Sequence, residues 1–378
     1  MSPKIRSLLI LIDGLGDEPN SKLAGLTPWT FAAKPHMDLL AQAGSTGQLS
    51  ICLDEFVPES CNCILRLLGV AKEDMPTNRT YLELLAYNKN LSDEAMVLRC
   101  NLAVRDARGR LVGFNGIGLN QDQMQEAAAV CNALCEEIEF LHLSEYRNLL
   151  VLKKEPDLLS CNVAPPHESL GEQVEILLKE VKDKSSSIGG LLEKSEKYLS
   201  MFNHDGLHYI LYPWGAATKS CLPSFEYLHG LTGGVVCKAE IVRGIAIAMG
   251  MKVLTPLSAT GDIDTVIADK ARATLELLQQ KDFILTHFNG TDEAAHRYDA
   301  VGKADFISRI DQQFLRPIIQ TYHDPLKIVI CGDHCTSSVT GRHSVGAVPV
   351  VAGVINTPLE RPALVSYKDI LRFLFKLP

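Results

Sequence analysis

The sequence has no run of eighteen apolar residues and no excess of basic side chains. A helix that crosses a membrane needs about twenty consecutive apolar residues, so no membrane span is expected. The formal net charge is -8, which argues against a general nucleic-acid or anionic-membrane surface. The apolar segment at residues 7–12 is short and lacks a cleavage region, so we interpret it as a buried strand rather than a signal peptide. We therefore expect a cytoplasmic protein without nucleic-acid or membrane partners.

The sequence also lacks internal repeats, long low-complexity segments and a zinc-ribbon pattern of cysteines. Its eleven cysteines are scattered, and many lie in apolar runs, so we expect reduced thiols that pack as small hydrophobic side chains. Hydrophobic residues make up 46% and charged residues 22%, as in an ordinary globular protein. A chain of 378 residues is expected to form two domains, or one large domain with an insertion.

Short apolar runs alternate with helical patterns at both ends of the chain. Examples are "SLLILI" followed by "FAAKPHMDLLAQAG" near the start, and "DFILTHF" and "LKIVI" in the second half. Strands that alternate with helices predict an α/β fold in which a parallel sheet is flanked by helices. We predict that residues 1–90 and 185–378 together form this core.

The pattern changes between these two parts, in residues 91–184. "DARGR" separates two runs of strand-forming residues and predicts a β-hairpin. A helical segment and the two strand-like runs of "EFLHLSEYRNLLVLKK" follow it. We therefore predict a smaller inserted α+β domain. The charged and Ser/Gly-rich "KEVKDKSSSIGG" is interpreted as its exit linker, and "LHYILYPWG" as the strand with which the core resumes.

Three predicted core strands end in acidic or histidine-containing turns: "LILIDGLGD", "FILTHFNGTDEAAH" and "KIVICGDH". Ligands of open α/β sheets bind beyond the carboxyl ends of the strands, so these turns are expected to meet at one edge. Asp292 and His296 are four residues apart and would share one face of a helix. Carboxylates and imidazoles at such an edge suit Zn or Mn. The two candidate ligand sets are Asp292, His296 and His343, and Asp13, Asp333 and His334.

Each of these residues also has a simpler interpretation. Asp13 could cap a helix that follows a short glycine turn. His334 and His343 could be hydrogen-bonded loop histidines. Asp292 and His296 could form an exposed ion pair on a helix. The metal hypothesis is favoured because all of these residues follow apolar strands and supply the ligand types of two metal sites.

Ser60 is a candidate nucleophile at the start of the helical segment "CNCILRLL". A metal ion could lower the pKa of its hydroxyl, and the helix N-terminus could stabilise an attached phosphate. Its alternative role is that of an ordinary helix N-cap. The flanking thiols of Cys61 and Cys63 are interpreted as packing residues, because no histidine base accompanies them in the sequence.

Taken together, these residues resemble those of the archaeal-type cofactor-independent phosphoglycerate mutases, which do not use 2,3-bisphosphoglycerate and belong to the alkaline phosphatase superfamily. The resemblance covers nearly the whole chain. Its most specific parts are "DEAAHRYDAVGKADFISRID" and "GDHCTSSVTGRHSVGAVPVVAGV". It implies an alkaline phosphatase-like parallel core with an inserted smaller α+β domain that contacts the substrate and acts as a lid.

The resemblance also implies a role for each candidate. One divalent ion would be held by Asp292, His296 and His343, and the other by Asp13, Asp333 and His334, with Ser60 bridging to the reacting phosphate. Ser60 would carry the phosphoryl group between neighbouring hydroxyls, which interconverts 3-phosphoglycerate and 2-phosphoglycerate. The implied enzyme is a glycolytic and gluconeogenic isomerase with a phosphoserine intermediate and two Mn²⁺ or Zn²⁺ ions, with Mg²⁺ as a further candidate.

Substrate binding is expected to involve Arg99, Arg147 and His167 of the insertion, with Lys219 near the phosphate. The arginine-rich run that is usual after the first inserted hairpin is replaced by "LVGFNGIGLNQ", which has no arginine. Arginine is the side chain best suited to gripping phosphate and carboxylate. This departure keeps an alternative open: a phosphotransferase or phosphohydrolase of the same superfamily that acts on another small phosphate compound, as a homoserine kinase-like enzyme would.

Overall fold

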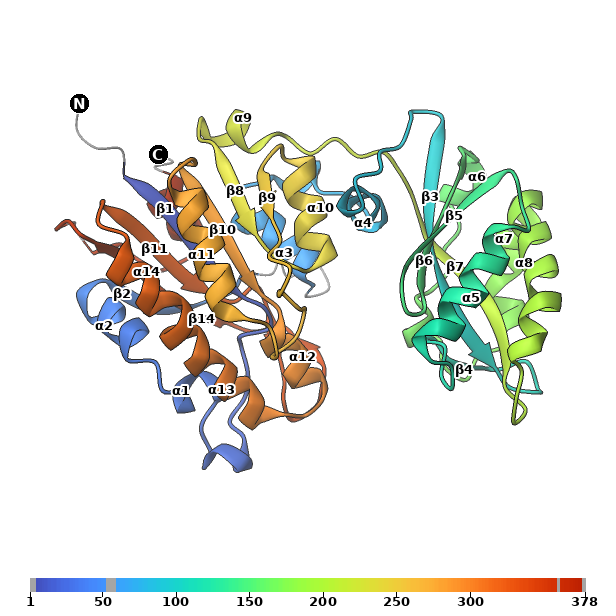
Figure 1. Cartoon of the computed structure of the whole chain (residues 1–378), viewed down its shortest axis with the longest axis horizontal. Helices are drawn as coiled ribbons and strands as arrows, with labels where there is room; N and C mark the ends of the chain where they lie inside the picture. The colour runs from blue at the N-terminus through green and yellow to red at the C-terminus, as the bar shows by residue number, and fades with distance from the viewer. Residues whose placement is uncertain (1–4, 52–58, 359–360, 376–378) are drawn as a thin grey trace. The chain divides into compact units, whose positions relative to one another are not determined.

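The computed structural model describes residues 5–51, 59–358 and 361–375. The chain forms two compact units (Figure 1). The first unit comprises the residues up to Met75 and those from Cys221 onwards, and the second comprises Pro76–Ser220. Each unit has its own sheet and its own buried core, as expected for a domain that carries an insertion. None of the helices within the described ranges is long and apolar enough to cross a membrane.

The first unit is built on a seven-stranded sheet of order β2-β14-β11-β1-β10-β8-β9. Its strands are β1 (Arg6–Ile12), β2 (Ser45–Leu49), β8 (Gly233–Val236), β9 (Lys252–Leu254), β10 (Phe283–Phe288), β11 (Leu326–Cys331) and β14 (Val348–Ile355). The strands from β11 to β9 are all parallel, whereas β14 is antiparallel to β11 and β2 is antiparallel to β14. This arrangement confirms the predicted α/β core with a parallel sheet, in which β1 lies centrally between β10 and β11.

Helices cover both faces of this sheet (Figure 1). The helices of the first unit are η1 (Ser21–Leu23), α1 (Pro28–Phe31), α2 (Pro35–Ala43), α3 (Ser60–Leu67), η2 (Lys72–Asp74), α9 (Phe225–His229), α10 (Glu240–Ala248), α11 (Ile267–Leu278), α12 (Gly290–His296), α13 (Ala300–Ile310), η5 (Asp311–Leu315), α14 (Arg316–Thr321) and α15 (Tyr367–Phe375). Leu8, Ile10 and Ile12 of β1 pack in one core with residues of α2, α11 and α13. Ser7, the residue before Leu8, faces the other side of the sheet, and its hydroxyl donates to the carbonyl of Leu374 in α15. Alternate residues of a strand face opposite sides of the sheet, and helices cover both sides of β1. This burial explains why the sequence of β1 is a continuous apolar run.

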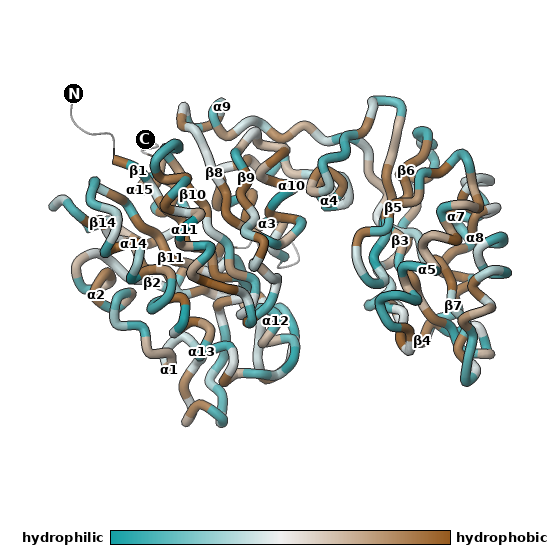
Figure 2. Tube along the Cα trace, viewed as in Figure 1, coloured by the Kyte–Doolittle hydropathy of each residue, from teal (hydrophilic) through white to brown (hydrophobic). Residues whose placement is uncertain are grey.

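The second unit has a five-stranded antiparallel sheet centred on β3 (Ala95–Arg105). The other strands are β4 (Leu111–Gly113), β5 (Ile138–Ser144), β6 (Arg147–Lys153) and β7 (His208–Thr218). The helices are α4 (Thr80–Ala86), α5 (Gln121–Asn132), α6 (Pro156–Leu159), η3 (Pro166–Glu168), α7 (Val174–Lys184), α8 (Ser186–Leu199) and η4 (Ser200–Phe202). Residues of α5, α7 and α8 share a buried core with every second residue of β3. Figure 2 shows apolar segments along the strands of both sheets.

The limits of the inserted unit differ from the predicted 91–184. The segment "LHYILYPWG" does not return to the core sheet as predicted, because β7 pairs with β3 from Met96 to Arg105. The segment "KEVKDKSSSIGG" is not an exit linker either: it forms the end of α7 and the start of α8, and the Ser185 side chain caps α8 by accepting from Ile188 N. The insertion therefore includes α4 before the predicted limit, and α8 and β7 after it.

Candidate metal centre and nucleophile

Asp13 follows β1 directly and lies at the carboxyl edge of the seven-stranded sheet, with only 2% of the residue exposed. The next residue, Gly14, has a φ of +59°, and a Cβ at this position would lie 2.6 Å from both Asp292 Oδ1 and Thr336 Oγ1. Glycine is therefore required in this turn. The helix that follows β1, η1, is capped by the side chain of Asn20. Asp13 thus does not act as the cap of that helix.

Asp333 and His334 lie just beyond the end of β11, and both are buried. Because β1 and β11 are parallel neighbours, the turns that follow them meet. Gly14 N donates to Asp333 Oδ1 at 3.0 Å. His334 Nε2 lies 3.2 Å from Asp13 Oδ1 and 3.5 Å from Asp333 Oδ2. Asp13, Asp333 and His334 each offer one ligand atom, and these atoms lie within 4.8 Å of one another.

Ser60 is the first residue of α3, and its hydroxyl faces this group. The distances from Ser60 Oγ are 3.3 Å to Asp13 Oδ1, 3.4 Å to Asp13 Oδ2 and 3.2 Å to His334 Nε2. The N-cap position of α3 belongs to Glu59, so the serine is not the cap. Cys61 and Cys63 are 2% and 1% exposed, in keeping with a packing role. Of the hydroxyl and thiols in this segment, the structure therefore brings the hydroxyl to the candidate metal ligands.

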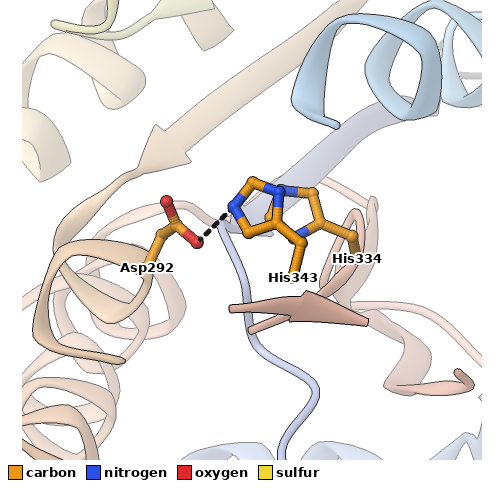
Figure 3. Close-up of side chains that lie close together, drawn as sticks. All are labelled: Asp292, His334 and His343. Carbon is orange, nitrogen blue, oxygen red and sulfur yellow. Dashed lines mark ion pairs between the residues drawn. The ribbon is translucent and has the colours of Figure 1, made fainter. Parts of the chain in front are cut away.

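Asp292 and His296 share one face of α12, and His343 of β13 (His343–Ser344) faces them. His296 Nε2 lies 3.2 Å from Asp292 Oδ2, and His343 Nε2 lies 3.4 Å from Asp292 Oδ1. The two imidazole nitrogens are 3.1 Å apart. Figure 3 shows His343 between Asp292 and His334, whose ring centroid is 4.3 Å from that of His343. Asp292 does pair with His296 across one turn of α12, but Asp292 is only 9% exposed, so the pair does not lie wholly on the surface.

Each charge in the first group affects the ionisation of its neighbours. Burial and the charge of Asp292 oppose the ionisation of Asp13, but hydrogen bonds with His287 and His334 lower the pKa of Asp13 to about 2. Burial and the Asp13 charge raise the pKa of Asp333 to about 6. Burial disfavours protonated His334, yet the charges of Asp333 and Asp13 raise its pKa to about 10. The imidazolium of His334 therefore balances part of the negative charge in the metal-free protein.

The second group shows the same balance. Burial alone would raise the pKa of Asp292, but hydrogen bonds with His296 and His343 hold it well below its usual value. The hydrogen bond with Asp292 raises the pKa of His296 to about 9, against the effect of burial. The protonated imidazole of His296 thus occupies the place of a cation beside Asp292.

These residues fit divalent metal ions. They supply three carboxylates and three imidazoles, the oxygen and nitrogen donors that Zn and Mn both accept. Buried carboxylates this close together are costly unless a cation or hydrogen bonds compensate them. Asp292, His334 and His343 also have ligand atoms within 4.8 Å of one another, so His334 belongs to both groups. The chemistry of the donor set favours two adjacent divalent cations.

Three further residues support the site and were not predicted from the sequence. His287, in β10, is buried, and its Nε2 lies 3.1 Å from Asp13 Oδ2. Thr336, in β12 (Cys335–Thr336), donates its hydroxyl to Asp292 Oδ1 at 2.5 Å. Lys303, in α13, is fully buried and contacts the turn after β1. The only sequence signal for His287 is a histidine inside an apolar strand run, which is equally typical of a core histidine.

The second unit gathers arginines around one carboxylate. Arg99 of β3 donates to Glu83 of α4 through Nε at 2.7 Å and through Nη2. Arg79 Nε lies 3.1 Å from Glu83 Oε1. Burial opposes the ionisation of Glu83, but these arginines lower its pKa below the usual value. The Arg99 guanidinium also lies over the Trp214 ring, 4.5 Å from its centroid.

The remaining predicted substrate residues also lie in the second unit. The ring centroid of His167 is 6.2 Å from that of Trp214. Burial lowers the pKa of His167, and the charges of Arg79 and Arg99 lower it further. The charge of Arg147 contributes to the lowered pKa of Glu83, to which Arg99 also donates, and the charge of Arg99 contributes to the lowered pKa of His167. Lys219 lies just after β7, where it pairs with Asp93 at 3.3 Å. The binding roles of all four remain predictions.

Comparison with known proteins gives the family. The metalloenzyme superfamily matches residues 5–357 of the chain. A 2,3-bisphosphoglycerate-independent phosphoglycerate mutase of Saccharolobus islandicus is 30% identical over 371 residues, which cover 91% of this chain and 87% of the relative. The chain belongs to this mutase family within the metalloenzyme superfamily. The family suggested by the sequence is thereby confirmed.

Other members show the same breadth of similarity. A 2,3-bisphosphoglycerate-independent phosphoglycerate mutase of Methanocaldococcus jannaschii is 29% identical over 367 residues, which cover 92% of this chain and 88% of the relative. A solved structure of a Pyrococcus horikoshii protein superposes with a TM-score of 0.72 at 24% identity, covering 98% of this chain and 92% of that protein. At this identity, the structural similarity speaks for the fold alone.

We predict that metal loading of this mutase-family protein releases protons. At pH 7.5 the metal-free protein carries protons on His334 and His296, whose pKa values are about 10 and about 9. Both imidazoles must be neutral to bind metal, so filling both sites should release roughly two protons, and affinity should rise with pH between 7 and 9. Below about pH 5 the metal should be lost. Calorimetric titration with Mn²⁺ in two buffers of different ionisation enthalpy measures the release, and a value of zero would contradict the assignment of these histidines.

Proposed function

We propose that this protein is a metal-dependent phosphoglycerate mutase that interconverts 3-phosphoglycerate and 2-phosphoglycerate through a phosphoserine at Ser60. The observation that carries the proposal is the position of the Ser60 hydroxyl, 3.2 Å from His334 Nε2 and 3.3 Å from Asp13 Oδ1. Its family relatives bear the name of this activity. The reaction would be that of an isomerase in glycolysis and gluconeogenesis.

The two ligand groups would bind two divalent ions, for which we propose Mn²⁺ or Zn²⁺. When bound, such ions lower the pKa of an adjacent hydroxyl and neutralise charge on a phosphate. Ser60 Oγ forms a bond to phosphorus while the bond from phosphorus to the 3-oxygen of the substrate breaks. The proton lost by Ser60 balances the one gained by the 3-oxygen. In the second half, the 2-oxygen takes the phosphoryl group back and Ser60 regains a proton.

Ser60 has a second property that suits this role. It begins an eight-residue helix, so the backbone N–H groups of the first turn of α3 point toward the end of the helix where its side chain lies. The N-terminus of a helix favours negative charge, and a phosphate attached at Ser60 would lie there. The N-terminus of helix α3 would therefore help to stabilise the phosphoserine that Ser60 forms.

A mutase outcome requires that the glycerate stays bound while the phosphoserine is shielded from water. We propose that the inserted unit acts as this lid, that Arg99, Arg147 and His167 bind the substrate carboxylate, and that Lys219 contacts the phosphate. Glu83 takes two of the five N–H donors of Arg99. The other donors of the guanidinium can hold a carboxylate, and stacking on Trp214 fixes its plane.

Replacement of Arg99 by alanine should weaken substrate retention. A charged hydrogen bond contributes about 1.5–3 kcal/mol, so KM for phosphoglycerate should rise by roughly 10- to 150-fold. The ratio of phosphate release to mutase turnover should rise as well, because water then competes for the phosphoserine. Arg105→Ala is the matched control. Arg105 lies at the end of the same strand as Arg99, and its guanidinium pairs with Glu196. If Arg99→Ala leaves both KM and the hydrolysis ratio unchanged, the substrate role of Arg99 is wrong.

The proposed function itself is tested with purified, Mn²⁺-loaded protein and ³¹P NMR. Incubation with either phosphoglycerate isomer should produce the same equilibrium mixture of both. A panel of other small phosphate esters is run beside it. Equilibration from both sides supports the mutase; phosphate release alone, or transfer only with another ester of the panel, overturns it in favour of a phosphohydrolase or a different phosphotransferase.

A further inference from the structure

A lysine lies directly behind the candidate metal centre. Lys303 of α13 is fully buried. Its Nζ is 2.8 Å from Gly14 O, 2.8 Å from Thr336 O and 2.9 Å from Asp17 Oδ2. An ammonium group has three N–H donors, and each of them has a close acceptor here. A fourth oxygen, Gly16 O, is 3.3 Å away.

These acceptors belong to the turns that carry the candidate ligands. One carbonyl follows Asp13 directly, on the turn after β1. Thr336 lies two residues after His334, and its hydroxyl donates to Asp292. Thr336 is also the strand partner of His343 in the β12–β13 pair. One buried ammonium therefore touches residues that are bonded or adjacent to ligands of both groups.

The counter-charge of the lysine strengthens this connection. The side chains of Lys303 and Asp17 are both 0% exposed. The Asp17 carboxylate, on the turn after β1, also accepts from Ser338 N, on the segment after β12, at 3.0 Å and 3.2 Å. Burying an ion pair costs folding free energy unless the remaining hydrogen-bonding atoms of both side chains find partners. Here the hydrogen bonds of Lys303 and Asp17 connect two loops to each other.

We infer that Lys303 is a positioning residue, which holds the turn after β1 and the turn after β11 at the separation that two adjacent metal ions need. The inference rests on the proposed metal centre. Without the ammonium, two buried carbonyls lose a donor and the Asp17 carboxylate loses its cation. The turns can then satisfy these groups only by moving apart or admitting water, and either change displaces Asp13 relative to His334.

The test is Lys303→Met, which keeps an unbranched side chain of similar length and removes the charge. Mn²⁺ is titrated by calorimetry and observed by electron paramagnetic resonance, because two Mn²⁺ ions at the usual spacing of about 4 Å couple magnetically. Loss of residues behind metal ligands typically weakens binding by about 10- to 100-fold. We expect a loss of this size in the variant, together with loss of the coupled signal.

The matched control is Lys327→Met. Lys327 is also buried in the first unit, but it lies near the start of β11, where its Nζ donates to Phe373 O. This variant should lose stability and keep both the affinity and the coupled Mn²⁺ signal. A general effect of deleting a buried ammonium is thereby separated from a positioning effect.

The outcomes are distinct. If the wild-type protein binds no Mn²⁺, the proposed metal centre fails. If the wild type binds two coupled ions and folded Lys303→Met does so with the same affinity, only the role of Lys303 is wrong. Should Lys303→Met not fold, Asp17→Asn decides, since it keeps the lysine and removes its counter-charge. Binding weakened about tenfold supports the inference, and unchanged binding overturns it.

Discussion

Replacement of Ser60 by alanine is expected to lower phosphoglycerate interconversion by at least about a thousandfold, because it removes the proposed nucleophile. The substitution deletes one oxygen, which lies 3.3 Å from Asp13 Oδ1 and 3.2 Å from His334 Nε2. The six carboxylates and imidazoles that we propose as metal ligands remain. The Mn²⁺ affinity of the variant should therefore stay near that of the wild type, while turnover of either phosphoglycerate isomer is lost.

Ser7→Ala provides the matched control for this experiment. Ser7 is a buried serine of β1 in the same unit, and its hydroxyl donates to Leu374 O at 2.8 Å. Its loss should cost about 1 kcal/mol of folding free energy and leave the rate unchanged. If Ser60→Ala retained a rate close to that of Ser7→Ala, phosphoryl transfer would have to proceed through another group.

Asp13→Asn should have an effect of similar size for a different reason. Asparagine keeps the shape of the side chain but carries no charge, and both carboxylate oxygens of Asp13 are engaged, with His334 and with His287. A neutral amide is a poor ligand for a divalent ion in this position. We expect the protein to bind one Mn²⁺ ion fewer and to lose roughly three orders of magnitude in rate, since Ser60 then lacks its activating ion.

Elemental analysis after gel filtration measures the bound metal of this variant, with Asp311→Asn beside it. Asp311 is an equally buried aspartate of the same unit, and it accepts from Met37 N and contacts His36 Nδ1, each at 2.8 Å. That control should be less stable but fully loaded and active. Full metal content in Asp13→Asn would show that Asp13 is not a ligand.

Local features of the sequence were enough to predict that the candidate ligand residues meet at one edge of the sheet. Asp13 and Asp333 come just after apolar runs that can only be buried strands, and parallel neighbouring strands end at the same edge. The spacing of Asp292 and His296 is that of one helix face. These signals need no knowledge of distant partners. The position of Ser60 was harder to predict, because a serine that begins a helix looks the same whether it caps the helix or faces a metal.

The features that were missed depend on contacts that no local pattern encodes. The alternation of β7 suits either sheet equally well, and only its pairing with β3 places it in the inserted unit. Ser185 was interpreted as part of a linker, although the same residue type caps helices. The lysine of α13 resembles an exposed helical residue in the sequence. Its buried position follows from the meeting of two distant loops, one with Asp17 and the other with Ser338, which are 321 residues apart in the chain.

The central claim is that the phosphoryl group passes through Ser60, and peptide mass spectrometry tests it most directly. Mn²⁺-loaded protein is mixed with 3-phosphoglycerate, quenched in acid during turnover, digested and analysed for phosphopeptides. The account predicts phosphate on Ser60 in the wild type, and none in the corresponding peptide of Ser60→Ala. Formation of 2-phosphoglycerate with phosphate on a different residue, or with no phosphorylated protein at any time of quenching, would contradict it.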